Sequence, residues 1–225
     1  MTRTTNARIA GITYLFYIAV AFPSLTLMTR ATSGNGTAAT LARVAEHASD
    51  VRVAILLTLL SCFSALVLAV TLYGITREVD HELAMLTLAC RVSEGAVGVV
   101  GIPMMQGLLW LATAGGGAGA PDVATVNALG AFLLMPAQSA MIGAPFFALG
   151  STVFSYLLLR GRLVPAPLAW LGLFASVLVV VGSPLQLAGI LEGPMTTYMW
   201  LPMLAFEVPL GLWLLFKGVA TPAPR

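Results

Sequence analysis

The sequence predicts an all-α fold, a polytopic transmembrane helix bundle, and three observations lead to this prediction. Of the 225 residues, 59% are hydrophobic and 9% are charged, whereas soluble domains carry about 25% charged residues. At least six apolar runs reach the roughly 20 residues that a helix needs to cross the hydrocarbon layer. These runs do not alternate between apolar and polar residues, as the strands of a membrane barrel would. We therefore expect a single integral membrane domain over residues 1–225.

Charged, proline-rich or glycine-rich segments divide the chain into six spans. A polar start leads directly into the first span without a small-residue cleavage site, so we expect that span to be retained and not removed as a signal peptide. A charged turn at 77–82 separates the second span from the third, and Pro165 and Pro167 separate the fourth from the fifth. The spans are expected at about 9–28, 51–73, 83–111, 138–159, 168–187 and 195–216.

Two segments between the spans are expected on the extracytoplasmic side. Residues 29–50 are expected to form a loop. Its second half, from Ala38 to Asp50, sets apolar Leu41 and Val44 against charged Arg43 and Glu46, which is the pattern of a short amphipathic helix on the membrane surface. A solvated loop helix is an equally open interpretation. Residues 113–137 form a loop and a surface helix that ends near Met135. If that helix is half inserted, it counts as a seventh span.

The positive residues predict the orientation. With six spans, one side of the membrane holds seven basic residues and the other holds three, which are Arg30, Arg43 and Arg52. Because cytoplasmic segments carry an excess of Lys and Arg, both termini are expected in the cytoplasm. The seven on the predicted cytoplasmic side are Arg3, Arg8, Arg77, Arg160, Arg162, Lys217 and Arg225.

Three ionisable residues lie deep inside predicted spans. Arg91 and Glu94 are three residues apart on one helical face, and Glu207 lies in the last span. Counted at 1.5 Å per residue, Glu94 is ~18 Å from Glu82, and Glu207 is ~15 Å from Lys217, so both carboxylates lie near the middle of the bilayer. A charge there costs roughly 2.5–3.5 kcal/mol on insertion scales. We therefore expect these three to face protein, water or a ligand, and they are the candidate catalytic residues.

One cation cannot neutralise two carboxylates in a site of low polarity, so one carboxylate is expected to keep a proton. The hypothesis is that Glu94 pairs with Arg91 and that Glu207 is the protonated acid. A purely structural interpretation stays open, since an Arg–Glu pair can simply neutralise itself and hold helices together.

Other polar, small and aromatic residues of the spans are candidates for binding a substrate beside these groups. Thr87 and Gly98 share the helical face of Arg91 and Glu94. Amides and hydroxyls commonly bridge helices, and tyrosines commonly pack or anchor at the interface, so each also has a structural interpretation. The candidates are Tyr14, Tyr17, Thr87, Gly98, Gln106, Trp110, Gln138 and Ser139.

Several classes of function are disfavoured. A net charge of +2 does not suggest nucleic acid. The two histidines, His47 and His81, fall in loops on opposite sides of the membrane, so no paired-histidine haem site is expected. Diphosphate-binding Asp clusters, a P-loop and the GxSxG pattern are absent from the sequence. We therefore expect no cofactor and no metal.

Three short stretches resemble a bacterial membrane family called domain of unknown function 4386. They are Ala7-Arg8-Ile9-Ala10-Gly11 with Tyr14 and Leu15, Arg91-x-x-Glu94 after the charged turn, and the helix from Phe147 to Arg160 followed by Leu163-Val164-Pro165. The resemblance covers nearly the whole chain. It implies a multi-pass protein of the bacterial cytoplasmic (inner) membrane with six or seven helices, and it implies no activity. Arg91 and Glu94 match the family's polar pair, while Glu207 has no assigned counterpart.

Two functional classes follow from these residues. In the first, the chain binds a small apolar or lipid-like molecule of isoprenoid type that enters from the bilayer, and Glu94 or Glu207 acts as a Brønsted acid without a cofactor. In the second, the same carboxylates serve a small proton-coupled transporter or a sensor or partner-binding subunit. Membrane lipid and a hydrophobic small molecule are the expected partners, and a plain structural membrane protein is the third possibility.

Overall fold

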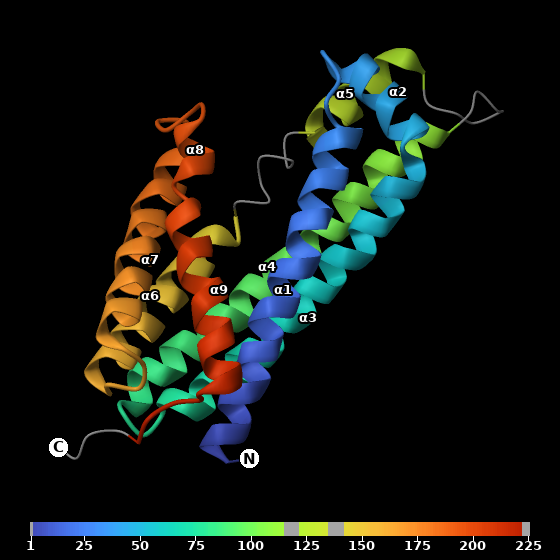
Figure 1. The fold of residues 1–225 in the computed structure, drawn as a ribbon. Helices are drawn as coiled ribbons and strands as arrows, with labels where there is room; N and C mark the ends of the chain where they lie inside the picture. The colour runs from blue at the N-terminus through green and yellow to red at the C-terminus, as the bar shows by residue number, and fades with distance from the viewer. Residues whose placement is uncertain (1, 115–121, 135–141, 222–225) are drawn as a thin grey trace. The chain divides into compact units, whose positions relative to one another are not determined.

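The computed structural model describes residues 2–114, 122–134 and 142–221, and those residues form helices joined by turns (Figure 1). The all-α prediction is confirmed for them. The helices are α1 (Arg3–Ala31), α2 (Thr37–Glu46), α3 (Ala48–Thr76), α4 (His81–Thr113), α5 (Val123–Leu134), α6 (Ala144–Arg160), α7 (Ala166–Leu187), α8 (Met195–Tyr198) and α9 (Leu201–Phe216).

Five helical segments in the described residues are long and apolar enough to cross a membrane. They are α1, α3, α4, α7 and the segment Met195–Phe216, which contains α8 and α9. Helix α6 is apolar but has 17 residues, or about 26 Å, slightly less than the ~30 Å hydrocarbon layer. The first four residues of the predicted fourth span, 138–141, lie outside the described residues. The count of six spans and the cytoplasmic termini therefore stay predictions.

Large apolar side chains point outward along these helices. Leu56 is 62% exposed, Val100 63% and Phe174 65%. In water such a surface would drive association, whereas in a bilayer the lipid chains cover it. Together with the spans, this identifies the chain as an integral membrane protein.

The described residues cluster into two compact units. The first contains those of Met1–Ile18, Phe63–Ala96 and Met141–Arg225, and the second contains those of Ala19–Cys62 and Val97–Ala140. Helices α1, α3 and α4 each contribute residues to both units. Each unit has a hydrophobic core of its own.

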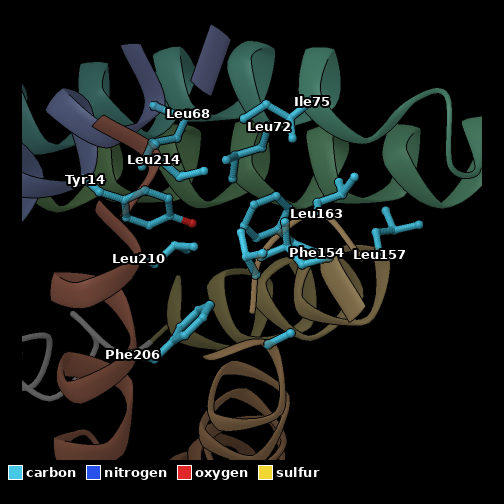
Figure 2. Packing of buried hydrophobic residues seen from close by; sticks show 14 of the residues in the cluster. Tyr14, Leu68, Leu72, Ile75, Phe154, Leu157, Leu163, Phe206, Leu210 and Leu214 are labelled. Carbon is cyan, nitrogen blue, oxygen red and sulfur yellow. The ribbon is translucent and has the colours of Figure 1, made fainter. Parts of the chain in front are cut away.

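The core of the first unit is built from α1, α3, α4, α6, α7 and α9. Figure 2 shows the Tyr14 ring of α1 beside Leu210 and Leu214 of α9, with Phe154 of α6 nearby. All four of these side chains are at most 2% exposed. Packing of this kind fixes the faces that α1, α6 and α9 turn toward one another, which matters for the polar residues on those faces.

The second unit holds the two short helices that the sequence predicts outside the membrane. Helix α2 buries Thr40, Leu41 and Val44, consistent with an amphipathic helix, but it ends at Glu46 and not at the predicted Asp50. It is shorter because α3 already begins at Ala48. Helix α5 covers Val123–Leu134, and its predicted end near Met135 lies outside the described residues.

A capping interaction of Asp122 begins α5. Its carboxylate accepts hydrogen bonds from the Thr125 amide at 2.8 Å and from the Thr125 hydroxyl at 3.1 Å. These two bonds stabilise the charged form and lower the pKa of Asp122.

Helix α1 begins six residues before its predicted start. The reason is Arg3, whose guanidinium donates to the Ile75 carbonyl near the end of α3, at 3.1 Å from Nε and 2.9 Å from Nη2. It also pairs with Glu78 at 3.3 Å. A cation at the carboxyl end of a helix satisfies orphan carbonyls and complements the helix dipole. The polar residues before the apolar run are therefore helical as well.

Gly11 permits a close approach of α1 and α9. A Cβ atom at this position would lie 2.6 Å from the Gly211 carbonyl oxygen and 2.6 Å from the Leu215 amide nitrogen, both backbone atoms. We expect Gly11→Ala to lower the free energy of unfolding by about 1–3 kcal/mol, because backbone atoms cannot yield as a side-chain end can. Reversible unfolding in detergent micelles would measure this.

The matched control is Gly101→Ala in α4, where a Cβ meets nothing within 4 Å. That change should be neutral or stabilising by up to about 1 kcal/mol, since alanine favours helix. Equal effects of the two substitutions would contradict the close α1–α9 contact.

Candidate functional site

Arg91 of α4 is completely buried and lies at the centre of a polar cluster in the first unit. Its Nη1 donates to Glu94 Oε2 at 3.0 Å, and its Nη2 donates to the Tyr14 hydroxyl at 3.2 Å and to the Ser151 hydroxyl at 3.1 Å. The Arg91 cluster, as we call it, consists of Tyr14, Tyr17, Arg91, Glu94, Ser151 and Glu207. Its members come from α1, α4, α6 and α9.

Glu94 is held by two donors. Besides Arg91 on one oxygen, the Tyr17 hydroxyl donates to the other oxygen, Oε1, at 3.1 Å. One of these hydrogen bonds comes from a guanidinium, and charge-assisted hydrogen bonds of this kind are stronger than neutral ones. This arrangement matches the pairing that the spacing of residues 91 and 94 predicts.

Glu207 reaches the same guanidinium from α9 but is held loosely. Its Oε1 lies 3.8 Å from Arg91 Nη2, beyond hydrogen-bond distance. Among the described residues no group donates a hydrogen bond to this carboxyl group. The two carboxylates thus differ, since Glu94 is fixed by two bonds and Glu207 is near the cation without a bond.

Aromatic rings enclose the cation. The Arg91 guanidinium carbon lies 4.7 Å from the centre of the Phe147 ring and 5.7 Å from the centre of the Tyr14 ring. Cation–π contacts of this type add most when the cation is desolvated. Helix α6 comes close enough to supply Phe147 and Ser151 because Gly150 lies against α4, where a Cβ would be 2.9 Å from Cys90 Cβ.

The members of the cluster differ in accessibility. The Arg91 side chain is 1% exposed, whereas that of Glu94 is 10% exposed and that of Glu207 8%. The Nε atom of Arg91 is buried without a hydrogen-bond partner in the described part of the chain. A small molecule or water that approaches the cluster therefore meets carboxylates before it meets the guanidinium.

Not every predicted site residue joins this cluster. Thr87 is fully buried, but its hydroxyl donates to the Leu83 carbonyl of its own helix at 3.2 Å. Gly98 belongs to the second unit and packs against Cys62. Gln106 and Trp110 belong to that unit as well, with exposed side chains. Gln138 and Ser139 lie outside the described residues.

Ser151 is a member of the cluster that the sequence reasoning missed. The available signal is its spacing: Phe147, Ser151 and Ser155 are four residues apart and therefore lie on one face of α6. Ser151 and Ser155 are both at most 1% exposed. Two hydroxyls on one face of an apolar helix indicate a face that packs inside the protein.

No metal-binding group can be assembled from the described residues, since nowhere in them do three His, Cys, Asp or Glu side chains gather. In the cluster, two carboxylates face one arginine. The chemistry available here is that of proton donors and acceptors, with Arg91 as a fixed positive charge.

A family model described as Domain of unknown function (DUF4386) matches residues 9–218. No curated protein matches the chain, and no solved structure does. The matched region includes every residue of the Arg91 cluster.

Proposed function

Because the chain belongs to the family described as domain of unknown function DUF4386, whose description names no activity, we propose its function from the Arg91 cluster. The chain is a multi-pass protein of the bacterial cytoplasmic membrane that binds a small apolar or lipid-like molecule, of isoprenoid type, against this cluster. Helix α6 belongs to the fourth of its six spans, and both termini are cytoplasmic, as the distribution of basic residues predicts. No cofactor takes part.

The main support for this proposal is that Glu94 and Glu207 differ in the number of hydrogen bonds and in their distance from Arg91. Glu94 has two hydrogen bonds and an ion pair at 3.0 Å, while Glu207 has only the cation at 3.8 Å. Arg91 neutralises one negative charge, and the second would be left in apolar surroundings. Glu207 therefore carries a proton, and as a neutral acid it can donate that proton to a ligand.

The neighbours of Glu207 favour an apolar ligand. Phe206 and Leu210 of the same helix are at most 1% exposed, and Phe147 covers the guanidinium. A double bond of an isoprenoid-type molecule placed beside Glu207 could accept its proton, and Phe147 could stabilise the resulting positive charge by a cation–π contact. Such a ligand would reach the site from the lipid.

Tyr17 favours a second candidate, proton-coupled transport or sensing. Its hydroxyl donates to Glu94, and its side chain is only partly buried. A chain of polar groups therefore extends from the partly buried Tyr17 side chain through Glu94 to Arg91. In this alternative the carboxylates load and release protons without changing a ligand chemically.

Mass spectrometry of compounds that copurify with the full chain tests the first candidate. We expect an apolar compound with the wild type and a roughly tenfold or greater loss of occupancy in Glu207→Gln, which equals about 1.4 kcal/mol of lost interaction. Glu82→Gln is the matched control, since this exposed glutamate lies on α4 outside the cluster. Unchanged occupancy in both Glu94→Gln and Glu207→Gln would show that neither carboxylate is the working group.

Proton flux into vesicles that contain the purified chain tests the second candidate. A pH-sensitive dye trapped inside should report flux with the wild type and Glu82→Gln and little with Glu207→Gln. A copurified apolar ligand without flux favours the first candidate, and flux without a ligand favours the second.

A further inference from the structure

An open cavity lies at one end of the first unit, away from the Arg91 cluster. It has a volume of about 410 Å³, within the ~300–1,000 Å³ range of small-molecule sites. Its wall comes from the turn between α6 and α7 and from the end of α9 with the segment that follows (Figure 1). The Ala220 amide donates to the Leu163 carbonyl at 3.0 Å, which joins these two segments.

Two cations line this cavity. Arg162 and Lys217 both have exposed side chains, and within the described residues neither has a hydrogen-bonding or ion-pairing side-chain partner. Nearby, Arg160 is paired with Asp80 at 2.7 Å and Arg3 with Glu78 at 3.3 Å. These two carboxylates are thus engaged elsewhere, and since no acidic side chain of the described residues lines the cavity, it keeps a net positive charge.

The backbone at Arg162 provides an independent observation. Helix α6 ends in a Schellman motif, in which the Leu163 amide donates to the Leu158 carbonyl and the Arg162 amide to the Leu159 carbonyl. Arg162 occupies the left-handed position of that motif, with φ of 50°, where glycine is usually favoured. An arginine therefore stands where the fold alone would favour glycine, and it lines the cavity.

Trp213 adds an amphipathic wall one turn before Lys217. Tryptophan is enriched at the membrane interface, where its ring lies at the level of the lipid headgroups. The cavity also follows the last residues of the final apolar helix, on the side predicted to be cytoplasmic. Arg162, Lys217 and Trp213 therefore lie at the depth in the membrane where the phosphate groups of the lipids are expected.

We propose that this cavity binds a phosphate group, with Arg162 and Lys217 as its ligands, and that the group belongs to the headgroup of an anionic membrane lipid. Arginine donates to two phosphate oxygens at once, and lysine adds a point charge. Trp213 packs against the glycerol part of the headgroup. A free phosphate ion would offer the same oxygens, so the test separates the two sources.

The test measures lipid affinity of the purified full chain in uncharged detergent micelles. The probes are phosphatidylglycerol with two eight-carbon chains, phosphatidylcholine with the same chains, and inorganic phosphate. Since one basic residue near an anionic lipid contributes roughly a fivefold gain in affinity, Arg162→Gly with Lys217→Gln should weaken phosphatidylglycerol binding by about tenfold or more. The control, Arg8→Gln with Arg77→Gln, removes the same charge from exposed positions outside the cavity and should change affinity by less than about threefold.

Arg162→Gly separates binding from folding. Glycine suits the left-handed position, so this variant should unfold at the same temperature as the wild type or higher, while its affinity for phosphatidylglycerol falls. Competition by inorganic phosphate would assign the site to the phosphate ion itself, and no competition would assign it to the lipid. Equal loss in the control pair, or phosphatidylcholine binding as tightly as phosphatidylglycerol, would overturn the proposal.

Discussion

Arg91→Met is expected to lower the free energy of unfolding by about 3–5 kcal/mol, because removing one partner of a buried ion pair leaves an uncompensated charge. In this chain four side chains lose an interaction when Arg91 is replaced. Glu94 loses its cation, Glu207 loses the nearest positive charge, and Tyr14 and Ser151 lose their donor. Reversible unfolding in micelles would measure the change. Arg77→Met is the matched control, since Arg77 is exposed and its replacement should cost less than about 0.5 kcal/mol.

A double variant separates charge from packing. In Arg91→Met with Glu94→Gln, the uncompensated carboxylate is removed together with the cation, so part of the lost stability should return. If Arg91→Met alone costs less than about 1 kcal/mol, the cluster contributes little to folding, and the ion pair at 3.0 Å is a weak interaction despite its burial.

The fold class and the pairing of residues 91 and 94 could be predicted because both depend on local properties of the sequence. Apolar runs of membrane length specify spans, and a spacing of three specifies a shared helical face. Tyr14 and Tyr17 add polar groups to the first predicted span, and each hydroxyl has a hydrogen-bond partner in the cluster.

The remaining features depend on how distant helices pack. Ser151 meets Arg91 because Gly150 lets α6 lie against α4, and a sequence does not reveal which glycine will face which helix. Conversely, Thr87 shares the face of Arg91 but bonds to its own helix, an alternative open to any threonine in a helix. Gln106 and Trp110 follow Glu94 on the same helix, yet they belong to the second unit.

Glu94→Gln and Glu207→Gln are expected to differ in stability although the chemical change is the same. Glu94 accepts one bond from a guanidinium and one from a hydroxyl. Hydrogen bonds to charged groups contribute about 1.5–3 kcal/mol, and neutral ones about 1 kcal/mol. Glutamine keeps one carbonyl oxygen but loses the charge, so Glu94→Gln should lower the free energy of unfolding by about 2–3 kcal/mol.

Glu207→Gln should cost less than about 1 kcal/mol. Its carboxyl oxygen is 3.8 Å from the cation, beyond the range of a hydrogen bond, and glutamine has nearly the shape of a protonated glutamic acid. Both variants, the exposed control Glu82→Gln and the wild type would be compared by unfolding at neutral pH. Similar losses for residues 94 and 207 would mean that Glu207 is ionised and paired with Arg91.

The difference in stability between Glu94→Gln and Glu207→Gln is needed to interpret the ligand and proton-flux measurements on the same variants. A variant that folds as well as the wild type but loses its ligand or its proton flux has lost a working group. A variant that loses both its stability and its function has lost structure. Glu207 is the one acid of the cluster for which the geometry predicts the first outcome, because its only contact with Arg91 is the one at 3.8 Å. Glu94, bound from two sides, should instead hold the Arg91 guanidinium in place. Compared with Glu94→Gln, the Glu94→Asp variant keeps the negative charge, so it should regain more of the free energy of unfolding than of the ligand occupancy or proton flux.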